Sequence, residues 1–199
     1  MHRKSDWPIV ILASRSPRRK QLLEQAGVLF TIQSADIEED FPDHLPATKV
    51  PEYIADNKAA AIAKKNPDSM VIAADTVVIL EGRIIGKPKD EADAEAMLRA
   101  LSGKKHEVVT GVVLQWKDKK MSFSEITEVY FHPLNEAQIQ YYINHYQPFD
   151  KAGAYAIQEW IGLIGIEKIQ GDYYNVMGLP VQSLMKALEK IFGSSYPLF

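Results

Sequence analysis

The fold of this chain is decided near its start, where the sequence reads IVILASRSPRRKQLLEQAG (residues 9–27). Residues 9–13 are apolar, short in extent and rich in β-branched side chains, which predicts a buried strand. The run that follows the turn predicts a helix, because Ser16 suits the N-cap, Pro17 the first helical position and Gly27 the residue after the C-cap. We therefore expect a strand that turns directly into a helix.

The turn itself, SRSPRR at residues 14–19, carries two hydroxyls and three guanidinium groups. A helix N-terminus presents free backbone N–H groups and the positive end of the helix dipole. Arginine suits bidentate recognition of phosphate. The pattern favours a phosphate-binding turn without a glycine-rich loop; the alternative is a capped helix whose arginines point into solvent.

Length and composition limit the class of protein. The chain has 199 residues, 46% of them hydrophobic and 25% charged, and we expect one domain over residues 1–199, with two lobes and a short tail at 193–199. A net charge of −3 gives no electrostatic case for a nucleic-acid or membrane partner. The lack of cysteine excludes disulfides, Cys-ligated zinc and a thiol nucleophile, and fits a cytoplasmic protein. No run approaches the roughly 18 apolar residues of a membrane span.

Beyond residue 27 the chain alternates between predicted strands and helices. The strands are expected at residues 30–34, 70–74, 77–80, 83–85, 106–116, 122–132 and 161–169, and the helices at 48–65, 90–101, 135–146 and 180–192. The combination of β-α units with two hairpins predicts an α/β fold with a mixed, twisted sheet and flanking helices, not an all-parallel sheet.

Asp75 and Thr76 directly follow the apolar strand predicted at residues 70–74. Ligands collect at the strand ends of α/β sheets. An aspartate there could hold a divalent cation or take a proton from water. Aspartate also caps turns frequently, and the sequence leaves both roles open.

Two lysines stand in segments that could approach a phosphate. Lys87 lies in Gly86-Lys87-Pro88, which is not a Walker A loop because proline follows the lysine where Ser or Thr is required. It is either a surface lysine in a turn or a point charge aimed at phosphate. Lys58 lies beside the apolar face of the helix predicted at 48–65, and it either extends to solvent or points into a cleft.

Carboxylates and an amide complete the set of candidate groups. Asp36, Glu38 and Glu39 cluster in a predicted loop, which suits a magnesium–phosphate site, although most such runs are merely solvated. Gln158 ends the run DKAGAYAIQ (residues 150–158), whose small residues allow close backbone approach to a ligand. Its amide offers both a donor and an acceptor, as reading a base edge requires.

Aromatic and imidazole side chains are expected in structural roles. Tyr155 could stack on a base, but packing in the core is the default interpretation. His106 and His132 lie near the ends of predicted strands, and neither has metal-ligand spacing to another histidine.

Phosphate ligands, carboxylates for a cation and a base-reading amide together suggest a nucleoside triphosphate bound with magnesium. In their order along the chain these motifs resemble those of the Maf family of nucleoside triphosphate pyrophosphatases, over about residues 9–192. The motifs are SRSPRR (14–19), ADTVV (74–78), GKP (86–88), SG with His106 (102–106), DKAGAYAIQ (150–158) and NVMGLP (175–180).

The resemblance implies a fold of two lobes around a central cleft, similar to inosine triphosphate pyrophosphatases. It implies hydrolysis of the triphosphate to the monophosphate and pyrophosphate, and the run at 150–158 looks like the branch that acts on dTTP and UTP. By the family pattern, Asp75 is the proton acceptor and Glu38 joins it as a ligand of Mg²⁺ or Mn²⁺. The implied substrate-binding residues are Ser14, Arg18, Arg19, Lys58, Thr76, Lys87 and Gln158.

One position departs from the family pattern: Glu159 follows Gln158 where relatives usually have glycine, so the base preference stays open. A homodimer is compatible with the resemblance. Four other functions remain as alternatives: a septum inhibitor that acts by binding a cell-division partner, a pyrophosphatase of the 7-methyl-GTP type, a hydrolase of modified pyrimidine nucleotides, and a single-stranded nucleic-acid binder, which the net charge opposes.

Overall fold

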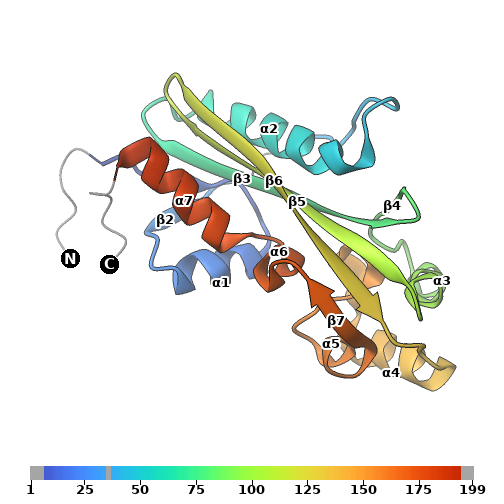
Figure 1. Cartoon of the computed structure of the whole chain (residues 1–199). Coiled ribbons are helices and arrows are strands. Elements are labelled where there is room, and N and C mark those ends of the chain that lie inside the picture. Colours follow the sequence, from blue (N-terminus) through green and yellow to red (C-terminus); the bar gives the residue numbers. More distant parts are fainter. Residues whose placement is uncertain (1–6, 35–36, 194–199) are drawn as a thin grey trace. The chain divides into compact units, whose positions relative to one another are not determined.

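The computed structural model describes residues 7–34 and 37–193. Asp36 of the acidic loop and residues 194–199 of the expected tail lie outside the described residues. The strands are β1 (Val10–Leu12), β2 (Phe30–Ile32), β3 (Met70–Leu80), β4 (Arg83–Ile85), β5 (Lys105–Trp116), β6 (Lys119–Phe131) and β7 (Ile166–Gln170) (Figure 1). The helices are α1 (Pro17–Gln25), α2 (Val50–Ala63), α3 (Glu91–Leu101), α4 (Glu136–Tyr146), α5 (Trp160–Gly165), α6 (Tyr173–Met177) and α7 (Val181–Phe192).

The strands form one mixed sheet, as the sequence predicted. Their order is β2-β1-β3-β5-β6-β7, and β4 pairs with β3 beside this path. β1 runs parallel to both β2 and β3, whereas β3–β4 and β6–β7 are antiparallel. The expected mixed α/β fold with flanking helices is therefore confirmed.

The chain forms two compact units. The first contains the described residues up to Asp75 together with 110–124 and 178–193, and the second contains residues 76–109 and 125–177. β3, β5 and β6 each contribute residues to both units.

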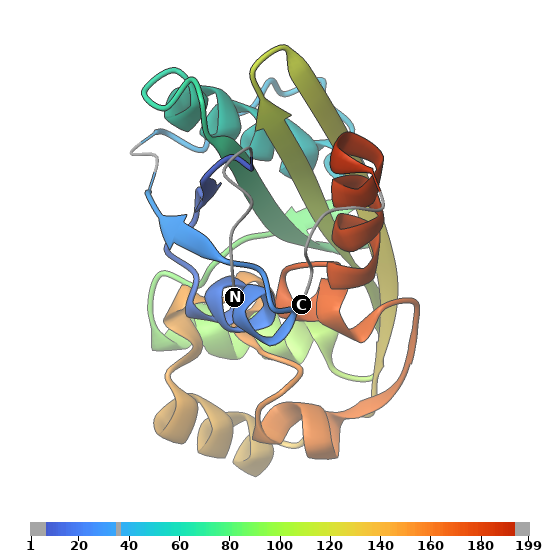
Figure 2. The same cartoon turned by 90° about the vertical axis from the view of Figure 1, so that its left-hand side faces the viewer.

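In the first unit, α2 packs on one face of the sheet. Its small residues Ala55 and Ala59 contact Ile11 and Val71, which are partners in the β1–β3 register. Because side chains alternate along a strand, the neighbouring residues of β1 and β3 face the opposite side. α7 lies on the other side of these strands from α2 (Figures 1 and 2). Both faces of this part of the sheet are thus covered.

A close contact fixes the height of α2 above β5. A Cβ atom built on Gly111 would lie 2.2 Å from the backbone nitrogen of Glu52, in the first turn of the helix. Glu52 also accepts hydrogen bonds from the hydroxyls of Ser122 (2.6 Å) and Ser124 (3.0 Å) on β6. Only a residue without a side chain fits at position 111.

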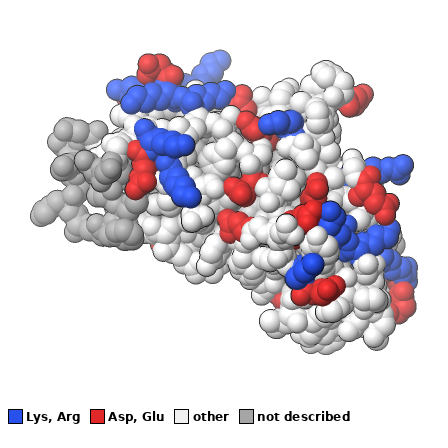
Figure 3. All heavy atoms as spheres, viewed as in Figure 1, with Lys and Arg blue, Asp and Glu red and all other residues white. Residues whose placement is uncertain are grey.

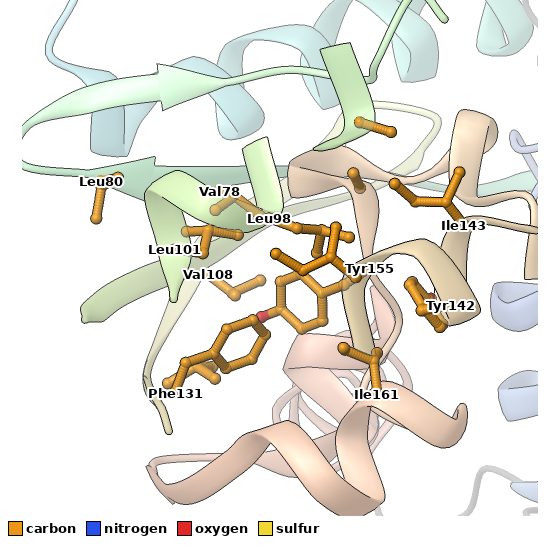
Figure 4. Close-up of a cluster of buried hydrophobic side chains, with 14 residues drawn as sticks. Val78, Leu80, Leu98, Leu101, Val108, Phe131, Tyr142, Ile143, Tyr155 and Ile161 are labelled. Carbon is orange, nitrogen blue, oxygen red and sulfur yellow. The ribbon is translucent and has the colours of Figure 1, made fainter. Parts of the chain in front are cut away.

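The second unit is built around an aromatic and aliphatic core. Tyr142 of α4 and Tyr155 pack with residues of α3 such as Leu98 (Figure 4). The imidazole of His106, only 1% exposed, lies edge-to-face against Phe131 and Tyr155. Its Nε2 is 2.7 Å from the Tyr155 hydroxyl. Tyr155 and His106 are therefore core residues, which agrees with the expected structural roles.

Charges of both signs are mixed on the surface. Lys and Arg are interspersed with Asp and Glu on the face shown in Figure 3. Ion pairs in the second unit include Lys105–Glu128 at 2.7 Å and Lys104–Glu81 at 3.0 Å. Within residues 7–34 and 37–193, no helix has the length and apolar character needed to cross a membrane.

Two expected elements were wrong in their bounds or type. β3 is one continuous strand from Met70 to Leu80, so Asp75 lies in its middle and not at a strand end. The β-branched run after Asp75 favours continued strand over a turn. The segment expected as a strand at 161–169 begins as α5 and becomes β7 only at Ile166. A short apolar run does not distinguish a buried helix from a strand by periodicity.

The buried imidazole predicts a loss of stability in acid. Burial lowers the pKa of His106 from 6.5 to about 4. The neutral ring is favoured in the folded state, so its contribution is complete above pH 6.5 and is lost as the pH falls toward 4. We expect the free energy of unfolding to fall by about 3 kcal/mol from this group over that interval.

Urea unfolding at several pH values between 7 and 4 measures this effect. A His106→Asn variant removes the titrating ring, so its stability should depend less on pH than that of the wild type. Equal pH dependence in the two proteins would contradict this expectation, because it would show that His106 titrates alike in the folded and unfolded states.

Candidate functional site

Arg19 is a buried cation in the first turn of α1, which belongs to the first unit. Ser16 caps that helix by accepting the Arg19 backbone N–H (3.4 Å). The Arg19 side chain is buried, and its Nε donates to the Gly178 carbonyl oxygen at 2.8 Å. Its Nη1 donates to the Ser14 hydroxyl at 3.2 Å. The guanidinium is thereby held in one orientation by the turn between β1 and α1 and by the segment that precedes α7.

Burial lowers the pKa of Arg19, and the nearby negative charges of Asp75 and Glu39 oppose that shift. Arginine keeps its charge in proteins even so, because its ordinary pKa is far above neutrality. A fixed, buried guanidinium of this kind suits an anionic ligand. The predicted strand-to-helix turn at residues 14–19 is confirmed, and its role in binding phosphate stays a prediction. Of its other arginines, Arg18 is half-buried and Arg15 is exposed.

Asp75 is paired with Lys58. The Lys58 ammonium lies 2.7 Å from Oδ1 of Asp75 and 2.6 Å from Oε1 of Glu39. Both Lys58 and Asp75 have side chains only 12% exposed. Lys58 therefore does not extend into solvent from α2, because its charge is placed between two carboxylates.

The acidic loop contributes Glu39 to this cluster. Glu39 contacts Lys58, and both Glu39 and the neighbouring Glu38 are exposed, so the role of Glu38 as a metal ligand stays a prediction. Successive residues of an irregular loop point in different directions, so the sequence alone could not choose between adjacent carboxylates. The acidic cluster was visible in the sequence, but its contacting member was not.

The donor set around Lys58 fits a divalent cation. Two carboxylates, from Asp75 and Glu39, already converge on one positive group. Oxygen ligands of this kind suit Mg²⁺ or Mn²⁺, and Mg²⁺ is commonly held by one or two carboxylates together with substrate phosphates. Among residues 7–34 and 37–193 no group of three His, Cys, Asp or Glu side chains forms a complete metal cage.

The remaining candidates belong to the second unit. Thr76 follows Asp75 in β3 and is half-buried, and Lys87 is exposed in the turn after β4. That turn is joined to the run 150–158 by a hydrogen bond from the Gly153 N–H to the Gly86 carbonyl (2.9 Å). Gln158, at the end of the run, is exposed. The structure thus brings the GKP and DKAGAYAIQ motifs together.

The last motif, residues 175–180, has a structural role in each of the two units. The Asn175 amide donates to the Val108 carbonyl and to the Thr127 hydroxyl, each at 3.0 Å, and so links β5 and β6 within the second unit. In the first unit, Gly178 supplies the carbonyl that holds Arg19. This motif positions other groups through its buried amide and its backbone.

Comparisons with known proteins agree with these motifs. A family model described as Maf-like protein matches residues 9–191. A dTTP/UTP pyrophosphatase of Cytophaga hutchinsonii is 52% identical over 189 residues, 95% of this chain and 87% of that protein. One of Halalkalibacterium halodurans is 48% identical over 186 residues, 94% of this chain and 97% of that protein. The solved structure of the Staphylococcus aureus Ham1 protein is similar in fold, with a TM-score of 0.52 at 18% identity over 92% of this chain and 98% of that chain.

The position of Lys58 predicts that it competes with a divalent cation. In a Lys58→Met variant the carboxylates of Asp75 and Glu39 lose their shared positive partner. We expect Mn²⁺, titrated calorimetrically without nucleotide, to bind about tenfold more tightly, since removing a competing charge at this distance favours another cation.

Lys64→Met is the matched control, because Lys64 is an exposed lysine at the end of the same helix. Its Mn²⁺ affinity should equal that of the wild type. Unchanged or weaker Mn²⁺ binding in Lys58→Met would contradict the competition.

Proposed function

The chain belongs to the Maf family, and on that premise we propose that it is a nucleoside triphosphate pyrophosphatase acting on dTTP and UTP. Curated relatives about half identical over nearly the whole chain have the printed name dTTP/UTP pyrophosphatase. The structural observation that carries the proposal is the cluster of Asp75, Lys58 and Arg19 in the first unit, where a carboxylate lies among fixed cations.

The cations would bind and orient the triphosphate. Arg19 is fixed by Ser14 and Gly178, so little side-chain entropy is lost when it binds a phosphate oxygen. Arg18, Lys58 and Lys87 would offset the remaining negative charge. Phosphoryl chemistry depends mainly on such positioning and charge stabilisation, because little covalent work is left to the protein.

Asp75 would accept the proton of the attacking water. The water oxygen bonds to the α-phosphorus, the bond to the bridging oxygen breaks, and pyrophosphate leaves with the electron pair. A divalent cation held by Asp75 with Glu38 or Glu39 would neutralise phosphate charge and make water easier to deprotonate. The ammonium of Lys58, 2.7 Å from Oδ1 of Asp75, would offset the negative charge of that carboxylate beside the phosphates.

Gln158 and Thr76 would read the pyrimidine edge. An amide donates and accepts, and a site that pairs both groups rejects bases that leave one of them unpaired. We propose a cytoplasmic location. The binding partner we propose is the nucleoside triphosphate substrate, and not a nucleic acid or a membrane. A homodimer is the assembly to test by light scattering.

Replacing the proposed proton acceptor should stop turnover. In Asp75→Asn the side-chain shape is kept but the base is lost, and general-base loss typically lowers kcat by about 10²–10⁴-fold. Pyrophosphate release from dTTP, UTP, CTP, GTP and 7-methyl-GTP with Mg²⁺ or Mn²⁺ measures this. Asp68→Asn, an exposed aspartate of the first unit, is the control and should match the wild type.

The same panel separates the remaining alternatives. Release from a 7-methyl-guanine nucleotide alone would overturn the dTTP/UTP assignment but keep the reaction class. No release from any nucleotide by folded wild-type protein would favour the partner-binding function. Near-normal release by Asp75→Asn would remove Asp75 from its proposed role.

Lys87 can be tested against its neighbour. Lys87→Ala should lower kcat/KM by about 10–100-fold, the effect of losing one hydrogen bond to a charged group. Lys89→Ala removes another exposed lysine two residues away and should leave the kinetics unchanged. Equal kinetics for Lys87→Ala and the wild type would make Lys87 a surface lysine.

A further inference from the structure

Lys151 and Glu159 connect the two ends of the segment that carries Gln158. The Lys151 ammonium lies 3.5 Å from Oε1 of Glu159 and 2.7 Å from Oδ1 of Asp150. The Lys151 side chain is only 9% exposed and that of Glu159 is 21% exposed. An ion pair so protected from water is screened much less than one on an open surface.

A buried phenol completes the connection. Tyr142 of α4 is fully buried, and its hydroxyl donates to Oε2 of Glu159. The Tyr142 hydroxyl oxygen in turn accepts the backbone N–H of Ala156 at 3.1 Å. The Glu159 carboxylate therefore acts through Tyr142 on the backbone just before Gln158, and through Lys151 on the start of the segment.

Backbone hydrogen bonds form on both sides of Gln158 in the sequence. The Glu159 N–H donates to the Ala156 carbonyl at 3.1 Å, and the Gly162 N–H donates to the Glu159 carbonyl at 2.9 Å. Position 162 accepts only glycine, since a Cβ there would lie 1.8 Å from the carbonyl oxygen of Ile157. Gln158 is therefore an exposed residue in a turn, and the backbone of Ala156 and of Glu159 on either side of it is hydrogen-bonded.

We propose that Glu159 is a positioning residue that sets the orientation of Gln158 and thereby sharpens the choice of pyrimidine. The inference rests on the proposed function, in which Gln158 reads the base. The Glu159 carboxylate contacts Tyr142 and Lys151, which leaves the exposed Gln158 as the side chain available to the base. A glycine at position 159 could make neither of these side-chain contacts.

Two other roles for Glu159 make different predictions. A carboxylate that faced the nucleotide would repel the triphosphate, so its removal would lower KM. A carboxylate that only stabilised the fold would change activity on every nucleotide by the same factor. A positioning residue changes the ratio between bases, because a misaligned amide loses its advantage with the correct base only.

The first measurement is amide hydrogen exchange without nucleotide, in the peptide that covers residues 154–160. Glu159→Gly and Tyr142→Phe should both exchange faster there than the wild type. Glu159→Gln keeps an oxygen that accepts the Tyr142 hydroxyl and should exchange at an intermediate rate. Glu167→Gln, which alters an exposed glutamate of β7 in the same unit, is the matched control and should not change this peptide.

The second measurement is kcat/KM for UTP relative to CTP in the same four variants. We expect the ratio to fall about tenfold in Glu159→Gly, mostly through KM for UTP, and to recover in part in Glu159→Gln, since about 1.4 kcal/mol of discrimination corresponds to that factor. Thermal unfolding of each variant shows that the comparison is made on folded protein.

An unchanged ratio in Glu159→Gly, or unchanged exchange at residues 154–160, overturns the inference while the reaction class stands. A lower KM for UTP in that variant overturns it in favour of direct repulsion. Wild-type protein that hydrolyses no nucleotide overturns the proposed function instead, and the two failures are thereby distinguished.

Discussion

The pairing of Asp75 with Lys58 is the interaction on which the proposed site depends. Asp75 lies in the middle of β3, a strand whose other residues in the first unit are apolar and buried. A carboxylate in such surroundings is unfavourable unless a cation lies close to it. Lys58 supplies that cation at 2.7 Å from α2, which packs on the same sheet through alanines. The packing of α2 on β3 therefore also sets the distance between the two charges of the site.

Arg19 extends the same principle. Its guanidinium is buried, and the neighbouring carboxylates of Asp75 and Glu39 oppose the destabilising effect of burial on its charge. The first unit thus buries cations and anions together and leaves them close to balance. A site of this kind can accept a polyanion with its cation without a large change in local net charge, which keeps the electrostatic work of binding small.

Local signals in the sequence predicted the elements that depend on local physics. The Ser16 cap and the Pro17 start of α1 each depend on residues within one turn, and the structure confirms both. The hairpin of β3 and β4 was likewise predicted from its turn. The first unit brings together four candidate site residues that the motifs named: Ser14, Arg19, Lys58 and Asp75.

What the sequence could not predict depends on contacts between distant residues or on loop direction. The contact of Glu39 with Lys58 follows from the path of an irregular loop. The contact of Glu159 with Tyr142 joins α4 to a turn 17 residues away, and no pattern marks it. The type of α5 was missed because its apolar run is equally compatible with strand and helix until the tight packing of Gly162 is known.

Gly111 shows how a missing side chain can set the geometry of a charged pair. With a Cβ at 2.2 Å from the Glu52 nitrogen, any other residue would push the first turns of α2 away from β5. Lys58 follows Glu52 in that helix, so a displacement of α2 would move its ammonium relative to Asp75. A side chain at position 111 would therefore disturb the Lys58–Asp75 salt bridge, although residue 111 takes no part in it. A change to alanine there would act on the site at a distance, by lifting the helix that carries the lysine.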